Sequence, residues 1–203
     1  MASELSQVWT SIREDPEVVC AIVTGAGEKA FCTGMDVDDV ASGDAYERGD
    51  EPVAWDRLTP IQNRCWKPVI AAINGMTAGG GLHFVVDCDL VLCSDAATFF
   101  DTHVKVGLIA GLEAVALARK IPLEAVFRLA LLGGAARMNA AEAHRLGMVG
   151  EVLAPEALMP RARELAGITR QHPPTAPAPS KRPISQSLAI DLHAVPHTAC
   201  QTP

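Results

Sequence analysis

Apolar residues in this chain fall into short runs that alternate with segments of helical spacing. Two runs, VVCAIVT at 18–24 and PVIAAI at 68–73, are partly β-branched and bounded by turn residues, which predicts buried strands. The spacing predicts helices at 3–13, 53–66 (interrupted at Thr59-Pro60), 111–120, 122–132, 140–146 and 155–168, and a further strand at 149–153. Strands alternating with helices favour an α/β fold with covered parallel sheets.

Glycine-rich corners follow both of the first two strands. Gly79, Gly80 and Gly81 allow a tight turn after the strand at 68–73 and predict a helix that begins there. Gly34 precedes a second polar helix start, after the strand at 18–24 and a turn at 25–27. Unpaired N–H groups and the positive end of a helix dipole favour an anionic group in front of such a corner. A tight turn with no ligand is the alternative.

Two segments carry a family resemblance. GEKAFCTGMDV at 27–37, followed by KPVIAAINGMTAGGG at 67–81, resembles the paired signature of the crotonase superfamily, the enoyl-CoA hydratase/isomerase family. The similarity runs from about Glu4 to about His193 and implies a spiral of β-β-α units with a helical C-terminal region. It implies an oxyanion hole in which the amides of Met35 and Gly80 hold the thioester oxygen of an acyl-CoA, stabilising enolate charge. The matched motif further places these residues at the substrate: Lys29, Ala30, Cys32, Gly34, Asp36, Gly79 and Gly81.

Histidines stand where hydratases of this family carry two catalytic glutamates. The resemblance places His83 and His103 at those positions. Histidine serves as acid or base near neutrality, and the dipole of the predicted helix favours a neutral ring at His83. Two such rings would tend to share the neutral state, which impairs proton donation. Asp101 would share a face with His103 in an extended segment, and Glu113, near the next helix start, is the remaining carboxylate expected to reach the pocket.

Two functions follow from this pattern. One is an acyl-CoA-binding enzyme of enoyl-CoA hydratase/isomerase type, in which thioester hydrolysis or double-bond isomerisation fits two histidines at least as well as hydration. The alternative is a catalytically inactive acyl-CoA-binding or assembly protein of the same fold. The expected partner is an acyl-CoA thioester, with no cofactor beyond coenzyme A. Ring nitrogens facing the space before the two amides favour the enzyme, and the resemblance implies a homotrimer or a dimer of trimers.

The net charge and the cysteine content limit which partners and which cellular compartment are expected. A net charge of −7 argues against a nucleic-acid partner. The candidate cations for the phosphates of coenzyme A are Lys29, Arg57, Arg64 and Lys67. His83, Cys88, Cys93 and His103 lack the paired spacing of zinc sites, so no metal is expected. Six cysteines in the chain, no signal sequence and no apolar run of membrane length favour a cytoplasmic protein without a membrane partner.

The chain divides by composition near residue 170. Residues 1–170 are expected to form a crotonase-like core from which the first strands of the family are missing. Residues 171–203 are proline-rich and are expected to be partly helical or disordered. Within this tail, 180–193 is similar to a family helix whose beginning Pro183 would disturb. The acidic segment 41–52 is expected to form a loop beside the ligand.

Overall fold

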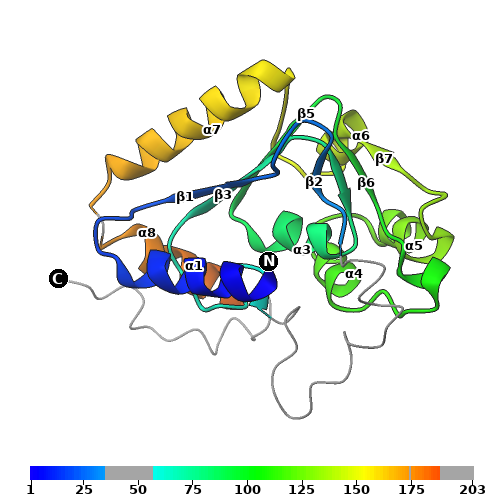
Figure 1. Ribbon diagram of the computed structural model, residues 1–203, viewed down its shortest axis with the longest axis horizontal. Coiled ribbons are helices and arrows are strands. Elements are labelled where there is room, and N and C mark those ends of the chain that lie inside the picture. Colours follow the sequence, from blue (N-terminus) through cyan, green and yellow to red (C-terminus); the bar gives the residue numbers. More distant parts are fainter. Residues whose placement is uncertain (35–56, 174, 188–203) are drawn as a thin grey trace, which may run out of the picture.

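The computed structural model of the protein contains two β-sheets (Figure 1). The structure describes residues 1–34, 57–173 and 175–187. The first sheet has the order β1 (Ala21–Thr24), β3 (Val69–Ile73), β5 (Leu90–Ser94) and β8 (Glu151–Leu153). Each neighbouring pair in it is parallel. The second has the order β2 (Ala30–Cys32), β4 (Met76–Ala78), β6 (Thr98–Phe100) and β7 (Met138–Asn139). Only β7 runs antiparallel to its neighbour among the described strands.

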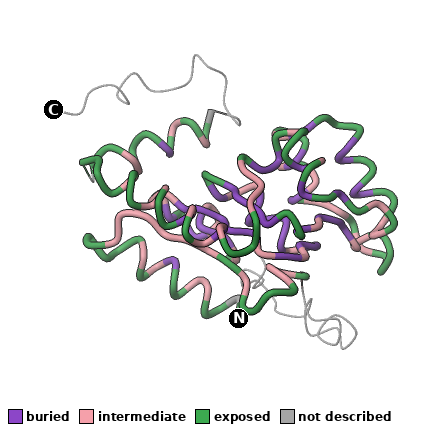
Figure 2. The backbone as a smooth tube through the Cα atoms, turned by 90° about the horizontal axis from the view of Figure 1, so that it is seen from above, coloured by how far each residue is buried: buried purple, intermediate pink, exposed green. Residues whose placement is uncertain are grey.

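The central strand β3 is buried on both faces, which explains its uninterrupted apolar sequence. All five of its residues are buried. Ile70 and Ala72 pack toward α7 (Pro155–Arg170), against Leu158. The alternate residues of β3 face the larger core, which includes residues of α3 (Gly80–Asp87). Figure 1 shows α7 on one side of this sheet and α3 on the other, and Figure 2 shows the buried backbone in the middle. The prediction of an α/β fold with covered parallel sheets is confirmed.

The helices agree with most of the predicted ranges. Besides α3 and α7, the described helices are α1 (Ala2–Glu14), the 3₁₀ helix η2 (His103–Val106), α4 (Leu112–Leu117), α5 (Leu123–Leu132), α6 (Ala140–Arg145) and α8 (Pro177–Ser187). α4 ends three residues before its predicted limit at Lys120, while α5 and α6 agree to within a residue. A helix beginning at the triple glycine is confirmed by α3.

The helix predicted at 53–66 is wrong where the structure describes it. Residues 60–64 form turns after a bend at 58–59, residues 65–66 form no regular element, and 53–56 lie outside the described residues. The side chain of Gln62 accepts hydrogen bonds from the backbone N–H groups of Leu58 and Thr59, at 2.8 and 3.0 Å. Arg64 then has a positive φ of 54°. Gln62 thus satisfies two donors at the start of this segment, and the left-handed conformation of Arg64 ends it before a helix can continue.

Part of the predicted tail packs on the core as a helix. α8 begins at Pro177, three residues before the predicted start, and Pro183 lies inside it. The Nζ of Lys181 lies 2.8 Å from the carboxylate of Asp89 and donates to the carbonyl of Lys67 at 3.1 Å. This buried ammonium joins α8 to the beginning of β3 and the loop before β5. The predicted division at residue 170 remains a prediction, since residues 188–203 lie outside the described part.

Candidate active site

The glycine corner between β4 and α3 lies directly against the corner after β2. Gly79 has φ 50° and Gly34 has φ 96°, so both adopt conformations that favour glycine. A Cβ atom added to Gly34 would lie 3.5 Å from the backbone nitrogen of Gly80. The two predicted corners are therefore adjacent. Met35 and Asp36 lie outside the described residues, so the convergence of the Met35 and Gly80 amides remains a prediction.

Gly81 has a packing role that is independent of any ligand. A Cβ atom at this position would lie 2.3 Å from the carbonyl oxygen of Cys32 in β2. Ala30 and Cys32 are in register with Met76 and Thr77 of β4. The first turn of α3 can therefore approach β2 only without a side chain at Gly81.

Four titratable side chains meet beside this corner, and all four were singled out in the sequence. His83 comes from α3, Asp101 from the connection after β6, His103 from the first residue of η2, and Glu113 from the first turn of α4. The Nδ1 atom of His103 lies 3.0 Å from Asp101 Oδ1 and 2.9 Å from Glu113 Oε1. The other oxygen of Glu113, Oε2, lies 3.4 Å from His83 Nε2. Glu113 thus lies between the two imidazoles.

Asp101 and His103 pair as predicted, but through a different backbone conformation. The segment is a turn into η2 rather than an extended strand, because Asp101 Oδ1 accepts a hydrogen bond from the backbone N–H of His103 at 2.7 Å. An aspartate that bonds the backbone two residues on stabilises a turn of this kind. The same carboxylate therefore positions the backbone and holds the ring.

The two carboxylates favour the charged form of His103. The hydrogen bond to Asp101 and then the interaction with Glu113 raise the pKa of His103 to about 10, against the opposing effect of burial. The His103 side chain is 23% exposed, whereas those of Asp101 and Glu113 are buried. His103 is therefore an imidazolium near neutral pH, and the expectation that both histidines share the neutral state is wrong for this ring.

One oxygen of Glu113 is left without a satisfactory partner. Oε1 is buried and, among the described residues, makes no hydrogen bond of good geometry, although His103 Nδ1 is 2.9 Å away. A single ring N–H cannot point at both carboxylates, and it is directed to Asp101. Buried acceptors are nearly always satisfied in native proteins, so this oxygen is available to a ligand.

The ring of His103 faces the glycine corner. Its Cε1 atom lies 3.8 Å from the position that a Cβ on Gly79 would occupy. Cε1 stands between the two ring nitrogens, and Nδ1 is held by the carboxylates. The ring of His103 therefore lies beside the glycine corner through Cε1, and the direction of Nε2 relative to the two amides remains a prediction.

A half-buried acid that the sequence pattern did not single out, Asp87, lies one helical turn after His83. Asp87 accepts a short hydrogen bond from the hydroxyl of Thr59, which is fully buried. Burial raises the pKa of Asp87, while the Thr59 hydroxyl and the charge of His83 oppose the rise. Its i, i+4 spacing from His83 was the available sequence signal.

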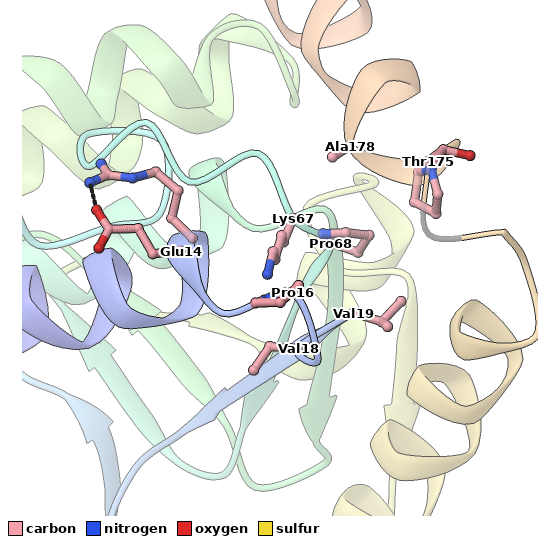
Figure 3. A pocket seen from close by; sticks show the side chains of 10 residues that line it. Glu14, Pro16, Val18, Val19, Lys67, Pro68, Thr175 and Ala178 are labelled. Carbon is pink, nitrogen blue, oxygen red and sulfur yellow. Dashed lines mark hydrogen bonds and ion pairs between the residues drawn. The ribbon is translucent and has the colours of Figure 1, made fainter. Parts of the chain in front are cut away.

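Other predicted groups lie apart from this cluster. Lys67 donates to the carbonyl of Asp15 and lines a groove of about 380 Å³ at the amino end of β3, with Pro16, Val19 and Thr175 (Figure 3). Lys29, Arg57 and Arg64 are exposed, and the structure gives none of them a contact with the cluster. Cys88 and Cys93 pack in the core. In the described part of the chain, no metal-ligand group joins either cysteine to the two histidines.

Comparison with known proteins identifies the family. The enoyl-CoA hydratase/isomerase family model matches residues 1–196, so the chain belongs to this family and has the crotonase fold. The chain is similar to a solved enoyl-CoA hydratase/isomerase from Mycobacterium paratuberculosis, with a TM-score of 0.88 and 34% identity over 98% of this chain and 77% of that one.

Two curated relatives show the chemistry found among similar proteins. One is (E)-benzylidenesuccinyl-CoA hydratase of Thauera aromatica, 39% identical over 170 residues, covering 81% of this chain and 63% of the relative. Another is carnitinyl-CoA dehydratase of Citrobacter koseri, 39% identical over 163 residues, covering 80% and 62%. The chain therefore spans less than two thirds of the length of either protein. None of its described helices is long and apolar enough to cross a membrane.

Proposed function

We propose that the protein is an acyl-CoA-processing enzyme that adds water to, or removes it from, an α,β-unsaturated thioester. The observation that carries the proposal is Glu113, which contacts His83 through one oxygen and His103 through the other. This arrangement supports unequal protonation of the two histidines, since His103 also has Asp101 beside it. Hydration needs one proton donor and one proton acceptor, which an unequal pair supplies. The names of the two curated relatives support the same reaction class.

Each histidine would present its free ring nitrogen to the substrate. With Nδ1 held by Asp101, His103 donates the proton on Nε2 to the α carbon. With Nε2 against Glu113, His83 accepts a proton from water at Nδ1 while the water oxygen bonds to the β carbon. The amide of Gly80, together with that of Met35, would stabilise the enolate oxygen. His83 then releases its excess proton to solvent and His103 regains a proton at Nε2 from solvent, because Glu113 meets His103 at Nδ1, which keeps its own proton throughout.

The assay is loss of enoyl-thioester absorbance on a panel of enoyl-CoAs that includes crotonyl-CoA and carboxylated or cationic acyl chains. Glu113→Gln should lower kcat about 100-fold or more, with little change in thioester binding. The matched control is Glu156→Gln, on the exposed first turn of α7. Because His103 must carry its proton, kcat/KM should fall as the pH rises towards about 10, the pKa of that ring.

The results separate this proposal from a non-catalytic binding protein. Tight binding of acyl-CoAs without turnover of any panel member would overturn the catalytic role and leave an acyl-CoA-binding or assembly protein. Hydrolysis to free coenzyme A, or double-bond migration, would keep the enzyme and replace the reaction. Equal activity of Glu113→Gln and the parent would remove Glu113 from the mechanism.

The proposed setting is a cytoplasmic homo-oligomer, a trimer or dimer of trimers, with coenzyme A entering only as part of the substrate. The five described cysteines are free thiols, which supports a reducing compartment. Large exposed apolar residues gather on α4 and α5, including Leu112, Val115, Phe127 and Leu131. Such a surface supports association with further copies. Sedimentation of the purified protein tests it: a monomer at micromolar concentration would contradict the assembly.

A further inference from the structure

Three of the clustered side chains have the composition and spacing of a metal-ligand set. Asp101, His103 and Glu113 each offer one ligand atom, and these atoms all lie within 4.8 Å of one another. We propose that they form a binding site for one divalent transition-metal ion of the zinc type. Imidazole and carboxylate ligands together suit Zn²⁺, Co²⁺ and Mn²⁺.

The distances within the cluster are close to those of a coordinated ion. His103 Nδ1 lies 3.0 Å from Asp101 Oδ1 and 2.9 Å from Glu113 Oε1. Ligand atoms on a tetrahedral Zn²⁺, with bonds of about 2.0–2.2 Å, stand about 3.3–3.6 Å apart. Both distances from Nδ1 are shorter than this, so the carboxylates would move slightly away from the ring to admit the ion.

A second observation points to a ligand at this place. Oε1 of Glu113 is buried, and its close contact in the described residues, His103 Nδ1 at 2.9 Å, does not have the geometry of a hydrogen bond. Leaving a buried acceptor unsatisfied is destabilising, and coordination to a cation would remove this cost. The glutamate side chain is 4% exposed and is directed into the cluster.

Neighbouring groups already hold the ligands in place. The backbone N–H of His103 donates to Asp101 at 2.7 Å, and His83 Nε2 lies 3.4 Å from the second oxygen of Glu113. Partners of this kind orient metal ligands in proteins. Two carboxylates would balance the charge of a divalent ion, which would take the place of the proton on His103 Nδ1.

Metal binding does not depend on the proposed hydratase function, although both use the same side chains. An ion on Nδ1 would leave His103 without the extra proton that it donates in the proposed reaction. We therefore expect Zn²⁺ to inhibit thioester turnover if both proposals hold. Binding is measured without substrate, so its failure and the failure of the enzymatic proposal are distinguishable.

The test is titration of the purified full chain with CoCl₂, followed by visible absorption, and with ZnCl₂, followed by calorimetry. One equivalent of Co²⁺ should bind and give d–d bands without a sulfur-to-metal charge-transfer band, because no cysteine is a ligand. Asp101→Asn and Glu113→Gln should each weaken Zn²⁺ binding at least about 10-fold. Glu156→Gln is the matched surface control and should leave it unchanged.

Circular dichroism and thermal melting establish that each variant is folded before titration. If one variant does not fold, the other and the Co²⁺ spectrum of the parent still decide the question. No binding to the folded parent at millimolar Co²⁺ would overturn the site. Binding that survives both folded variants, or a spectrum showing thiolate ligation, would place the ion elsewhere and also overturn it.

Discussion

Replacing Asp101 by asparagine tests how strongly the carboxylates hold the charge of His103. Asparagine keeps an oxygen that can accept the 2.7 Å hydrogen bond from the backbone N–H of His103, so the turn into η2 should survive. What is lost is the negative charge 3.0 Å from Nδ1. The substitution therefore separates the electrostatic role of Asp101 from its role in the turn.

The size of the expected loss of stability follows from the raised pKa of His103. A rise from 6.5 to about 10 corresponds to about 5 kcal/mol at full conversion, at about 1.4 kcal/mol per pH unit. The hydrogen bond to Asp101 is the largest single cause of the rise, and solvent screens a ring that is 23% exposed. We therefore assign about 2 kcal/mol of folding stability to the Asp101 charge.

The direction of the His103 pKa shift sets the pH range in which Asp101 stabilises the fold. The pKa of His103 is higher in the folded protein than in the unfolded chain, so its charge stabilises the fold fully at pH values below the unfolded pKa of 6.5. This stabilisation is lost as the pH rises through about 10, the folded-state pKa. Asp101→Asn should therefore be about 2 kcal/mol less stable than the parent near pH 6. The two proteins should converge above about pH 10.

Urea unfolding from about pH 6 to about pH 10 measures this difference. Asp95→Asn, at an exposed position, is the matched control and should show no such convergence. An NMR titration of the His103 ring, assigned by comparison with His103→Gln, gives the pKa directly. A stability difference that is constant with pH, or a ring that titrates near its ordinary value, would refute the role given to the carboxylates.

Three further substitutions test the contacts that hold the site in place. Gly81→Ala should lower the free energy of unfolding in urea by about 2–3 kcal/mol, because its methyl group would meet the Cys32 carbonyl at 2.3 Å. The control Gly167→Ala lies in open space within α7 and should be neutral or stabilising. Equal effects of the two substitutions would contradict the close packing at Gly81. Trp9→Phe removes the 2.8 Å hydrogen bond from the indole to the Leu58 carbonyl and should lower the free energy of unfolding by about 1–2 kcal/mol. An unchanged midpoint of urea unfolding would show that α1 does not depend on this bond. Lys181→Met leaves the Asp89 carboxylate without its ammonium partner and should speed proteolysis within α8, and a cleavage pattern identical to that of the parent would rule out Lys181 as the anchor.

The sequence by itself determined three of the eight described strands, β1, β3 and β8, together with the glycine corners and the family resemblance. β3 is recognisable because a strand covered on both faces must be apolar throughout, as residues 69–73 are. Gly34 and Gly79 are recognisable because glycine readily adopts positive φ. These signals are local, so they place each corner along the chain, whereas the family resemblance implied that the two corners meet and the fold brings them together.

The protonation of the site was decided by the tertiary structure. Sequence spacing places His83 and His103 in the site but cannot say that Glu113 lies between their rings, since that depends on how α4 packs beside α3. For the same reason the neutral state expected for both histidines was wrong for His103. A charge depends on all groups within a few ångströms, and those groups come from three separate elements.

Tertiary structure likewise overrode local propensity on either side of the core. The helical spacing at 57–66 yields turns, because Gln62 caps two backbone N–H groups and Arg64 adopts a left-handed conformation. Pro183 was expected to disturb a helix, yet α8 continues through it while Lys181 reaches Asp89. In both segments a few specific side-chain contacts outweigh a weak local preference, and those contacts exist only once the chain has folded.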